Sequence, residues 1–319
     1  MNKNLKITVV GIGGVGGYVG GMLAKRYPDI TLVARGKRRE SLQEKGLRLH
    51  SGLNGEIEVR PGRIVESAEE IQEIQDMVII CVKNYSLEEV CQSLKGCIGQ
   101  NTLVLPVMNG ADTGERAQRF LGRGIVVDSV IYITAFSNPD YSVTQIGKYA
   151  EIQIGLREET PEKKKALQTA WECMKEAGLD CHISQDIQAA VWEKYIFNCG
   201  YNVITTYYMA MVEELWKDQE KCKEFRQLME EAYQVAMAKH IHIREGYVDS
   251  KYDRFMHMDV GSTSSMKRDF EGGKASELET FSGYLVSEAE RLQVPVPLSE
   301  KIYQDLKQRS IGFRIGFRI

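Results

Sequence analysis

The sequence predicts an N-terminal α/β domain followed by an all-α C-terminal domain. Three observations predict this fold class. Short apolar runs alternate with helical patterns in the first half, a glycine-rich turn follows the first run, and helical patterns fill nearly all of the chain beyond about residue 182. A chain of 319 residues is also long enough for two cores. We therefore expect domains over residues 1–180 and 181–319.

The first domain is predicted to contain a parallel sheet. A run that is apolar on both faces belongs in a sheet whose two sides are covered by helices. Residues 15–26 carry a helical pattern, and they separate the first two such runs. The runs of strand length, all rich in β-branched or other apolar residues, are 6–10, 30–34, 77–82, 103–107 and 125–130.

Three further segments of this domain have other patterns. Residues 47–64 are more polar, alternate in hydrophobicity and contain glycines, which predicts an antiparallel excursion or a short hairpin. Residues 142–156 alternate again and predict edge strands that close the domain. Residues 161–177 have the periodicity of one amphipathic helix, with Gly178 as its C-cap.

Composition excludes several classes of protein. Lys and Arg number 41 against 44 Asp and Glu, with no basic block, so a nucleic-acid partner is not expected. The seven cysteines include no CxxC pair, which favours reduced thiols and a cytoplasmic location. Residues 7–24 are uncharged, but seven of them are glycine, which favours a buried strand and turn over a membrane span. His240 and His242 would diverge on a helix, so no metal site is expected.

Residues 11–16 match the GxGxxG pattern of dinucleotide-binding loops, between a predicted strand and a predicted helix. Gly11 would permit the tight turn, Gly13 would let the backbone approach a pyrophosphate, and Gly16 would let the helix pack closely on the strand. Gly14 and Val15 would place the helix N-terminus at the phosphates. The segment thus predicts a Rossmann-type domain, the alternative being a glycine-rich turn without a ligand.

The end of the second predicted strand indicates which dinucleotide binds. An NAD site usually has an acidic residue here, which binds the ribose 2′-hydroxyl. This chain has Ala34 followed by Arg35, so we expect no carboxylate to repel a 2′-phosphate and a guanidinium to bind it. The sequence favours NADPH over NADH. The alternative is a solvated surface arginine.

Two polar residues follow later strands of the predicted sheet. Lys83 comes after the run 77–82, and Asn109 comes after the run 103–107. Ligands of such sheets bind beyond the carboxyl ends of the strands, so both residues are candidates for contact with the cofactor. Lys83 could instead be an exposed loop lysine, and Asn109 with Gly110 could be only a turn.

Two segments of the second half contain candidate catalytic and substrate-binding residues. Lys194, Asn198 and Asn202 recur every four residues among bulky apolar neighbours, so they share one side of a helix. Asparagine is a poor helix former, which favours a specific hydrogen-bonding role over an exposed polar stripe. Ser276 and Glu279 match a capping box, and that pattern alone explains Glu277 as an acid in a first helical turn.

Over nearly its whole length the chain resembles the ketopantoate reductases, also called 2-dehydropantoate 2-reductases. The resemblance rests on the combined order and spacing of several short motifs. They are the GIGGVG loop, the VARG strand end, Cys81-Val82-Lys83, Met108-Asn109-Gly110, the helix with Trp192, Lys194, Asn198, Cys199 and Asn202, and Ser264-Ser265-Met266 with Glu277 twelve residues beyond Ser265.

The resemblance implies NADPH-dependent reduction of a small 2-oxo acid, with 2-dehydropantoate first, in pantothenate biosynthesis. It implies that Lys194 is the catalytic acid, assisted by Glu277, and that the substrate contacts these two residues and Asn109. The same resemblance adds Asn198, Asn202 and Ser265 to the substrate site and places Arg35, Lys83 and Asn109 on the cofactor side.

The chain departs from the family pattern mainly on the substrate side. Val203-Ile204 replaces a usual Pro-Leu, Leu278-Glu279 replaces Ile-Asp, and Ser282 precedes a glycine where the family tends to have asparagine. A reductase of another small 2-oxo acid and a non-catalytic NADP-binding sensor stay open as alternatives. The oligomeric state, with a homodimer among the options, is also left open.

Overall fold

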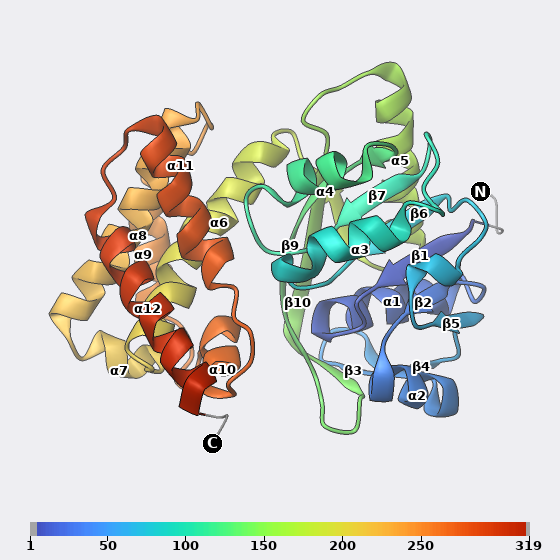
Figure 1. Ribbon diagram of the computed structural model, residues 1–319, viewed down its shortest axis with the longest axis horizontal. Helices are drawn as coiled ribbons and strands as arrows, with labels where there is room; N and C mark the ends of the chain where they lie inside the picture. The colour runs from blue at the N-terminus through green and yellow to red at the C-terminus, as the bar shows by residue number, and fades with distance from the viewer. Residues whose placement is uncertain (1–4, 317–319) are drawn as a thin grey trace. The chain divides into compact units, whose positions relative to one another are not determined.

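The computed structural model describes residues 5–316, and these form two compact units that divide between Ile187 and Gln188. The predicted α/β domain and all-helical domain are both present (Figure 1). The units divide a few residues beyond the expected position of 180. The reason is the strand β11 (Asp180–Ile183), which pairs with the first unit.

The first unit contains the expected parallel sheet. Its six strands have the order β5-β2-β1-β6-β7-β8, and every neighbouring pair is parallel. The central strands β1 and β6 are buried along their whole length, which is the burial that their mostly apolar sequences predict. The strands are β1 (Ile7–Val10), β2 (Thr31–Val33), β5 (Arg63–Val65), β6 (Met77–Ile80), β7 (Leu103–Pro106) and β8 (Ile125–Val126).

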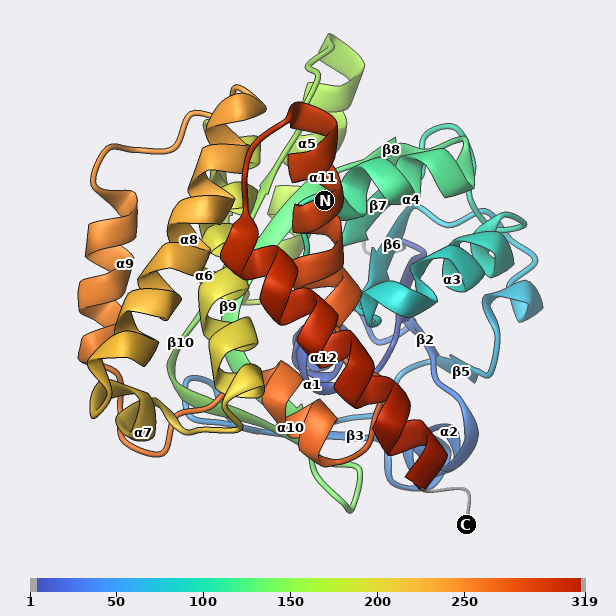
Figure 2. The same cartoon turned by 60° about the vertical axis from the view of Figure 1, so that its left-hand side comes forward.

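Helices cover this sheet on both faces. The helices α3 and α4 pack over Val78, Ile80 and Val104, whereas α1 packs over Ile7 and Val9 on the opposite face. The views in Figures 1 and 2 show α3 and α4 beside each other. The helices of this unit are α1 (Gly14–Arg26), α2 (Gly36–Lys45), α3 (Leu87–Leu94), α4 (Thr113–Leu121) and α5 (Pro161–Glu176), with the 3-10 turns η1 (Ala68–Glu70) and η2 (Asn84–Ser86).

A second sheet packs on the outer side of α1. Its order is β11-β10-β3-β4, and β9 pairs with β10. The hairpin expected within residues 47–64 is confirmed, because β3 and β4 are antiparallel. A Cβ on Gly17 of α1 would lie 2.4 Å from a methyl carbon of Val143, so glycine permits this close packing. The strands are β3 (Leu47–Ser51), β4 (Gly55–Val59), β9 (Asp128–Ser137), β10 (Val143–Gly155) and β11.

Two predictions about these strands are wrong. Residues 142–156 do not form edge strands, because β10 is one long strand that pairs with β9 on one side and with β3 and β11 on the other. Alternating hydrophobicity shows that one face of a strand is buried, but it does not reveal how many neighbours the strand has. Residues 125–130 do not form a single strand either. The chain leaves the parallel sheet after β8 and enters the second sheet at Asp128.

The second unit is helical throughout its described part. Phe225 and Phe255 stack at 4.0 Å between ring centroids in its core, and Figure 2 shows α6, α8 and α12 alongside one another. No helix in the described part of the chain is long and apolar enough to cross a membrane. The helices are α6 (Ile187–Tyr207), α7 (Val212–Trp216), α8 (Gln219–Ala238), α9 (Tyr247–Met256), α10 (Ser265–Glu271), the π-helix η3 (Glu279–Gly283), α11 (Tyr284–Leu292) and α12 (Pro297–Gly316).

Candidate active site

The glycine-rich loop has the geometry of a dinucleotide-binding turn. Gly11 has φ +88°, and a Cβ there would lie 2.6 Å from Val82. A Cβ on Gly16 would lie 2.0 Å from the Gly11 carbonyl oxygen, so only glycine lets α1 start this close to β1. Nothing lies within 4 Å of the Cβ position of Gly13, the N-cap of α1. The loop therefore leaves room for a phosphate at a helix N-terminus, which Gly14 and the half-buried Val15 begin.

Arg35 follows β2 as expected, but it has a carboxylate partner. Its guanidinium lies 2.6 Å from an Oε1 of Glu89, in the first turn of α3. The prediction that no carboxylate faces Arg35 is therefore wrong, because the acid comes from a segment 54 residues away. Both side chains are more than half exposed, so the pair is weak and a stronger ligand can replace it.

Arg38 connects the glycine-rich loop to the second sheet, and the sequence analysis missed it. Its Nε donates to the Ile12 carbonyl oxygen at 2.9 Å, and another guanidinium nitrogen donates to the carbonyl of Tyr141. Burial lowers the pKa of Arg38 to about 10, which keeps the side chain charged at neutral pH. Asp140 and Ser142 brace the receiving turn, and Ser142 hydrogen bonds lower the pKa of Asp140 to about 2.

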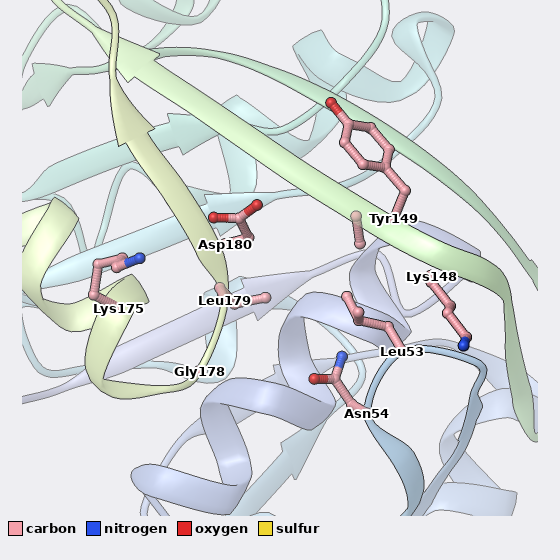
Figure 3. A pocket seen from close by; sticks show the side chains of 9 residues that line it. Leu53, Asn54, Lys148, Tyr149, Lys175, Gly178, Leu179 and Asp180 are labelled. Carbon is pink, nitrogen blue, oxygen red and sulfur yellow. The ribbon is translucent and has the colours of Figure 1, made fainter.

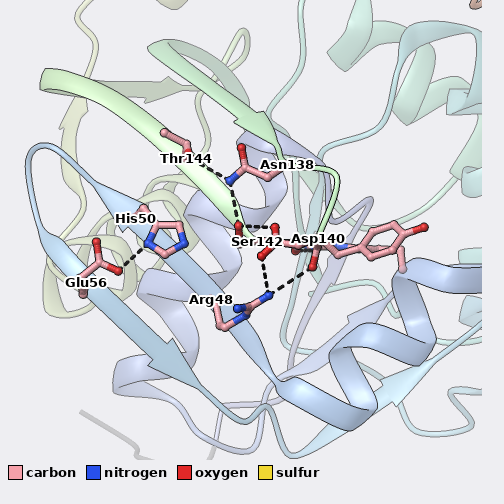
Figure 4. Close-up of polar contacts among 9 residues, drawn as sticks. Arg48, His50, Glu56, Asn138, Asp140, Ser142 and Thr144 are labelled. Carbon is pink, nitrogen blue, oxygen red and sulfur yellow. Dashed lines mark hydrogen bonds and ion pairs between the residues drawn. The ribbon is translucent and has the colours of Figure 1, made fainter.

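Figure 4 shows the polar cluster around this turn. Arg48 pairs with Asp140 at 2.9 Å, and Asn138 donates to the hydroxyls of Ser142 and Thr144. These contacts fix the turn that accepts the hydrogen bond from Arg38.

A pocket of about 380 Å³ lies elsewhere on the first unit (Figure 3). It shares no residue with the predicted site, and its lining is Leu53, Asn54, Lys148, Tyr149, Ala150, Lys175, Gly178, Leu179 and Asp180.

Lys83 and Asn109 lie at the ends of neighbouring strands. Ile80 of β6 pairs with Pro106 of β7, and Lys83 and Asn109 each lie three residues beyond one of these two positions. The buried Asn84 joins the two loops, because its Nδ2 donates to the Asn109 carbonyl oxygen at 2.5 Å. The structure thus brings these two predicted residues to one edge of the sheet, together with the glycine-rich loop after β1.

Asn84 is itself held by Arg116 of α4, another residue that the sequence analysis missed. Two guanidinium nitrogens of Arg116 donate to the side-chain and main-chain oxygens of Asn84, at 3.1 and 3.2 Å. Neither residue belongs to a motif, and Arg116 lies 32 residues from Asn84. A fork of this kind fixes the side chain of Asn84 in both position and orientation.

The predicted stripe of Lys194, Asn198 and Asn202 lies on α6, as expected. Asn202 Nδ2 donates to Asn198 Oδ1 at 3.2 Å, and the amide of Met266 lies 3.5 Å from Asn202 Oδ1. This contact brings the N-terminus of α10, where Ser265 is the first residue, to the asparagines. The amides and Ser265 therefore belong to one polar region of the second unit.

Glu277 and Lys194 act on each other electrostatically. Burial lowers the pKa of Lys194 to about 8, and the carboxylate of Glu277 opposes this shift. Glu277 is 4% exposed, so a hydrogen-bonded partner is required for its charge. An ammonium near its titration point beside a buried carboxylate is suited to donating a proton at neutral pH.

The predicted capping box at Ser276 is wrong. Glu279 does not turn back to cap a helix, because its carboxylate accepts from the hydroxyl of Tyr303 at 2.8 and 3.0 Å. The segment begins instead with a π-helix over Glu279–Gly283. The two-residue pattern of a capping box cannot reveal a competing partner on α12.

No group of three or more His, Cys, Asp and Glu side chains that could hold a metal ion occurs among the residues that the structure describes. The seven cysteines are free thiols, and all except the half-buried Cys81 are buried.

Two sequence models of one family match most of the chain. The model described as ketopantoate reductase PanE/ApbA matches residues 7–159, and the C-terminal model of the same family matches residues 186–310. The uncharacterized oxidoreductase YkpB of Bacillus subtilis (strain 168) is 29% identical, over 95% of this chain and 98% of its own length. A 2-dehydropantoate 2-reductase of Mesorhizobium japonicum is 26% identical, over 93% of this chain and 95% of its own length.

Solved structures have the same fold. The PanE/ApbA family ketopantoate reductase from Ralstonia eutropha JMP134 aligns with a TM-score of 0.88 at 24% identity, over 97% of this chain and all of that one. A D-mandelate dehydrogenase in ternary complex with NADH and anilino(oxo)acetate aligns with a TM-score of 0.85 at 20% identity, with the same coverage. At these identities the likeness establishes the fold alone.

Proposed function

Because the chain belongs to the ketopantoate reductase family, PanE/ApbA, and is an oxidoreductase of that family, we propose that it reduces 2-dehydropantoate to pantoate with NADPH, a step of pantothenate biosynthesis. The observation that carries the proposal is the interaction of Lys194 with Glu277 beside the Asn198 and Asn202 amides. An acid, a carboxylate and two amides are the groups that a hydroxylated 2-oxo acid needs.

The glycine-rich loop fits the pyrophosphate of a dinucleotide, because the Cβ position of Gly13 is open while those of Gly11 and Gly16 are closed by backbone and side chain. Arg35 would bind the 2′-phosphate in place of Glu89, which favours NADPH. Lys83 and Asn109 would contact the cofactor at the strand ends. When bound, the nicotinamide supplies the hydride that reduces the carbonyl carbon.

Lys194 would protonate the carbonyl oxygen as negative charge develops on it. A group with a pKa of about 8 is roughly nine-tenths protonated at pH 7, and it loses its proton more readily than an ordinary lysine. The ammonium would also stabilise the developing alkoxide before transfer. Glu277 would keep Lys194 charged and would accept a hydrogen bond from the distal hydroxyl of the substrate.

The amides would orient the substrate. Asn198, Asn202 and Ser265 offer donors on α6 and on the first turn of α10, where the helix dipole favours a carboxylate. We also propose Asn109 as a substrate contact. A 2-oxo acid held at both its carboxylate and its hydroxyl has its carbonyl fixed for one-sided attack.

Reduction of a different small 2-oxo acid on the same scaffold is the second candidate. The observation that favours it is the segment around Glu277, where Glu279 binds Tyr303 and the buried Ser282 hydroxyl has no hydrogen-bond partner. Both positions depart from the family pattern. A third possibility, an NADP-binding sensor without turnover, makes Lys194 dispensable.

A steady-state assay of NADPH absorbance with 2-dehydropantoate, and with a panel of branched and hydroxylated 2-oxo acids, tests the proposal. We expect the highest kcat/KM with 2-dehydropantoate and a preference for NADPH over NADH. A higher kcat/KM with another 2-oxo acid would support the second candidate. Tight NADPH binding without turnover of any panel member would support the sensor.

A further inference from the structure

The π-helix η3 begins two residues after Glu277, in the same unit as Lys194. Single π-turns are rare, and they occur frequently at functional sites because they shift the residues around them. The main chain of Glu277 is bonded to this turn, because its carbonyl oxygen accepts from the amides of Thr280 and Phe281 at 3.0 and 3.1 Å. A contact that positions Thr280 and Phe281 therefore also positions the main chain of Glu277.

Tyr195 of α6 binds this turn directly. Its hydroxyl lies 3.0 Å from the Thr280 carbonyl oxygen and 3.1 Å from that of Phe281, so one donor is shared by two main-chain acceptors. The thiol of Cys199, one helical turn further along α6, donates to the same Phe281 carbonyl at 3.2 Å. Both donors come from the helix that carries Lys194.

The ring of Tyr195 is fixed as firmly as its hydroxyl. The residue is 1% exposed and packs edge-to-face against Trp192 at 5.2 Å and Tyr284 at 5.8 Å. Tyr284 is the first residue of α11 and directly follows η3. Tyr195 therefore contacts the π-turn at its middle through the hydroxyl and at its end through the ring.

The other side of the turn is held by α12. Tyr303 donates to the Glu279 carboxylate, and Lys307 donates to the Tyr303 oxygen at 3.1 Å. A Cβ on Gly283 would lie 2.3 Å from a carboxylate oxygen of Glu279, so the side chain of Glu279 covers the end of the turn. The π-turn is thus clamped between α6 and α12.

We propose that Tyr195 is a positioning residue, whose hydroxyl holds the Thr280–Phe281 main chain and thereby fixes Glu277 relative to the Lys194 ammonium. The contacts stand independently of any substrate, and the consequence for turnover rests on the proposed function. Sequence reasoning passed over Tyr195 because it is one of several bulky residues between Lys194 and Asn198, with no pattern that marks its hydroxyl.

The test compares Tyr195→Phe with a matched control, Tyr208→Phe. Tyr208 also donates its hydroxyl, to Glu224 at 2.5 Å, but it lies beyond the end of α6 and this bond goes to α8 rather than to η3. The readout is the pH dependence of acylation of Lys194 by a limiting amount of acetic anhydride, measured by mass spectrometry. This measurement gives the pKa of the amine and requires no turnover.

Displacing Glu277 weakens the interaction of its carboxylate with Lys194, and that interaction raises the pKa of Lys194. We expect Tyr195→Phe to lower that pKa from about 8 by roughly 0.5 to 1 unit. The control should leave it unchanged. With 2-dehydropantoate, kcat should fall about tenfold in Tyr195→Phe, with KM for NADPH within twofold.

An unchanged or raised pKa of Lys194 in folded Tyr195→Phe would overturn the positioning role. If that variant does not fold, Tyr303→Phe loosens the same turn from α12 and should move the pKa in the same direction, and an unchanged value there would be equally decisive. A lowered pKa in an enzyme that turns over no 2-oxo acid would keep Tyr195 as a positioning residue and refute only the proposed function.

Discussion

Replacing Glu89 with glutamine should strengthen NADPH binding, because this carboxylate occupies the guanidinium that we assign to the 2′-phosphate. The Arg35–Glu89 pair is more than half exposed on both sides, so breaking it costs about 0.2–1 kcal/mol. A doubly charged phosphate on the same guanidinium would lie about 5 Å from the Glu89 carboxylate. In water the repulsion is then about 1.7 kcal/mol before salt screening, which removes a large part of it.

Glu89→Gln removes both the cost of breaking the ion pair and the screened repulsion. The net gain in the binding free energy of NADPH is about 1–1.4 kcal/mol, which corresponds to a five- to tenfold lower Kd for NADPH. NADH lacks the phosphate, so its Kd should change less than twofold. Isothermal titration with each dinucleotide at two salt concentrations measures both values. The gain for NADPH should shrink at the higher concentration, because both side chains are solvent-exposed.

Glu88→Gln is the matched control, since Glu88 occupies the same first turn of α3 and carries the same charge. It should alter the Kd of NADPH by less than twofold. Equal effects of the two substitutions would mean that only net charge matters. A gain for NADH as large as that for NADPH would place the 2′-phosphate elsewhere and refute the role of Arg35.

Three further predictions concern the loop and the proton donor. Gly13→Ala should keep the melting temperature, because its Cβ meets only open space, but it should weaken dinucleotide binding at least about tenfold. Gly16→Ala should lose about 1–3 kcal/mol of unfolding free energy, because its Cβ would clash with the Gly11 carbonyl. Calorimetry and titration separate the two, and equal loss of stability would contradict the geometry. Lys194→Ala should lower kcat by about 10²–10⁴-fold with circular dichroism unchanged, and a value within a few fold of wild type would remove Lys194 as the acid. Since Lys194 must be protonated, kcat/KM for reduction should be constant below pH 8 and fall above it. Glu277→Gln should move this break to lower pH, because Glu277 raises the pKa of Lys194. A break that stays at the same pH in Glu277→Gln would contradict the pairing of the two residues.

The sequence predicted the parts of the site that depend on neighbouring residues. The strand, turn and helix around Gly11–Gly16 follow from local sterics, and the i, i+4, i+8 spacing of Lys194, Asn198 and Asn202 is a property of one helix. Both patterns carry their structural meaning within a dozen residues. Their placement was therefore predictable without knowledge of the tertiary fold.

Interactions across long sequence separations were not predictable. Nothing near Arg35 indicates that Glu89 will face it, and nothing near Glu279 indicates that Tyr303 will displace it from a cap. Likewise the alternation in residues 143–155 gives the buried face of β10 but not the strands on its edges. Periodicity specifies which face of an element is buried, whereas packing decides which residue lies opposite.

Because β10 pairs with three other strands, it determines where the chain can be truncated without exposing an edge of the second sheet. β9 binds one edge, while β3 and then β11 bind the other, with a register shift between Ile146 and Ala150 on the β9 side. A fragment that stops at residue 180 would expose hydrogen-bonding groups beside Ile152 and Ile154, a template for intermolecular aggregation. A fragment that runs to Ile187 retains β11, which covers this edge of β10.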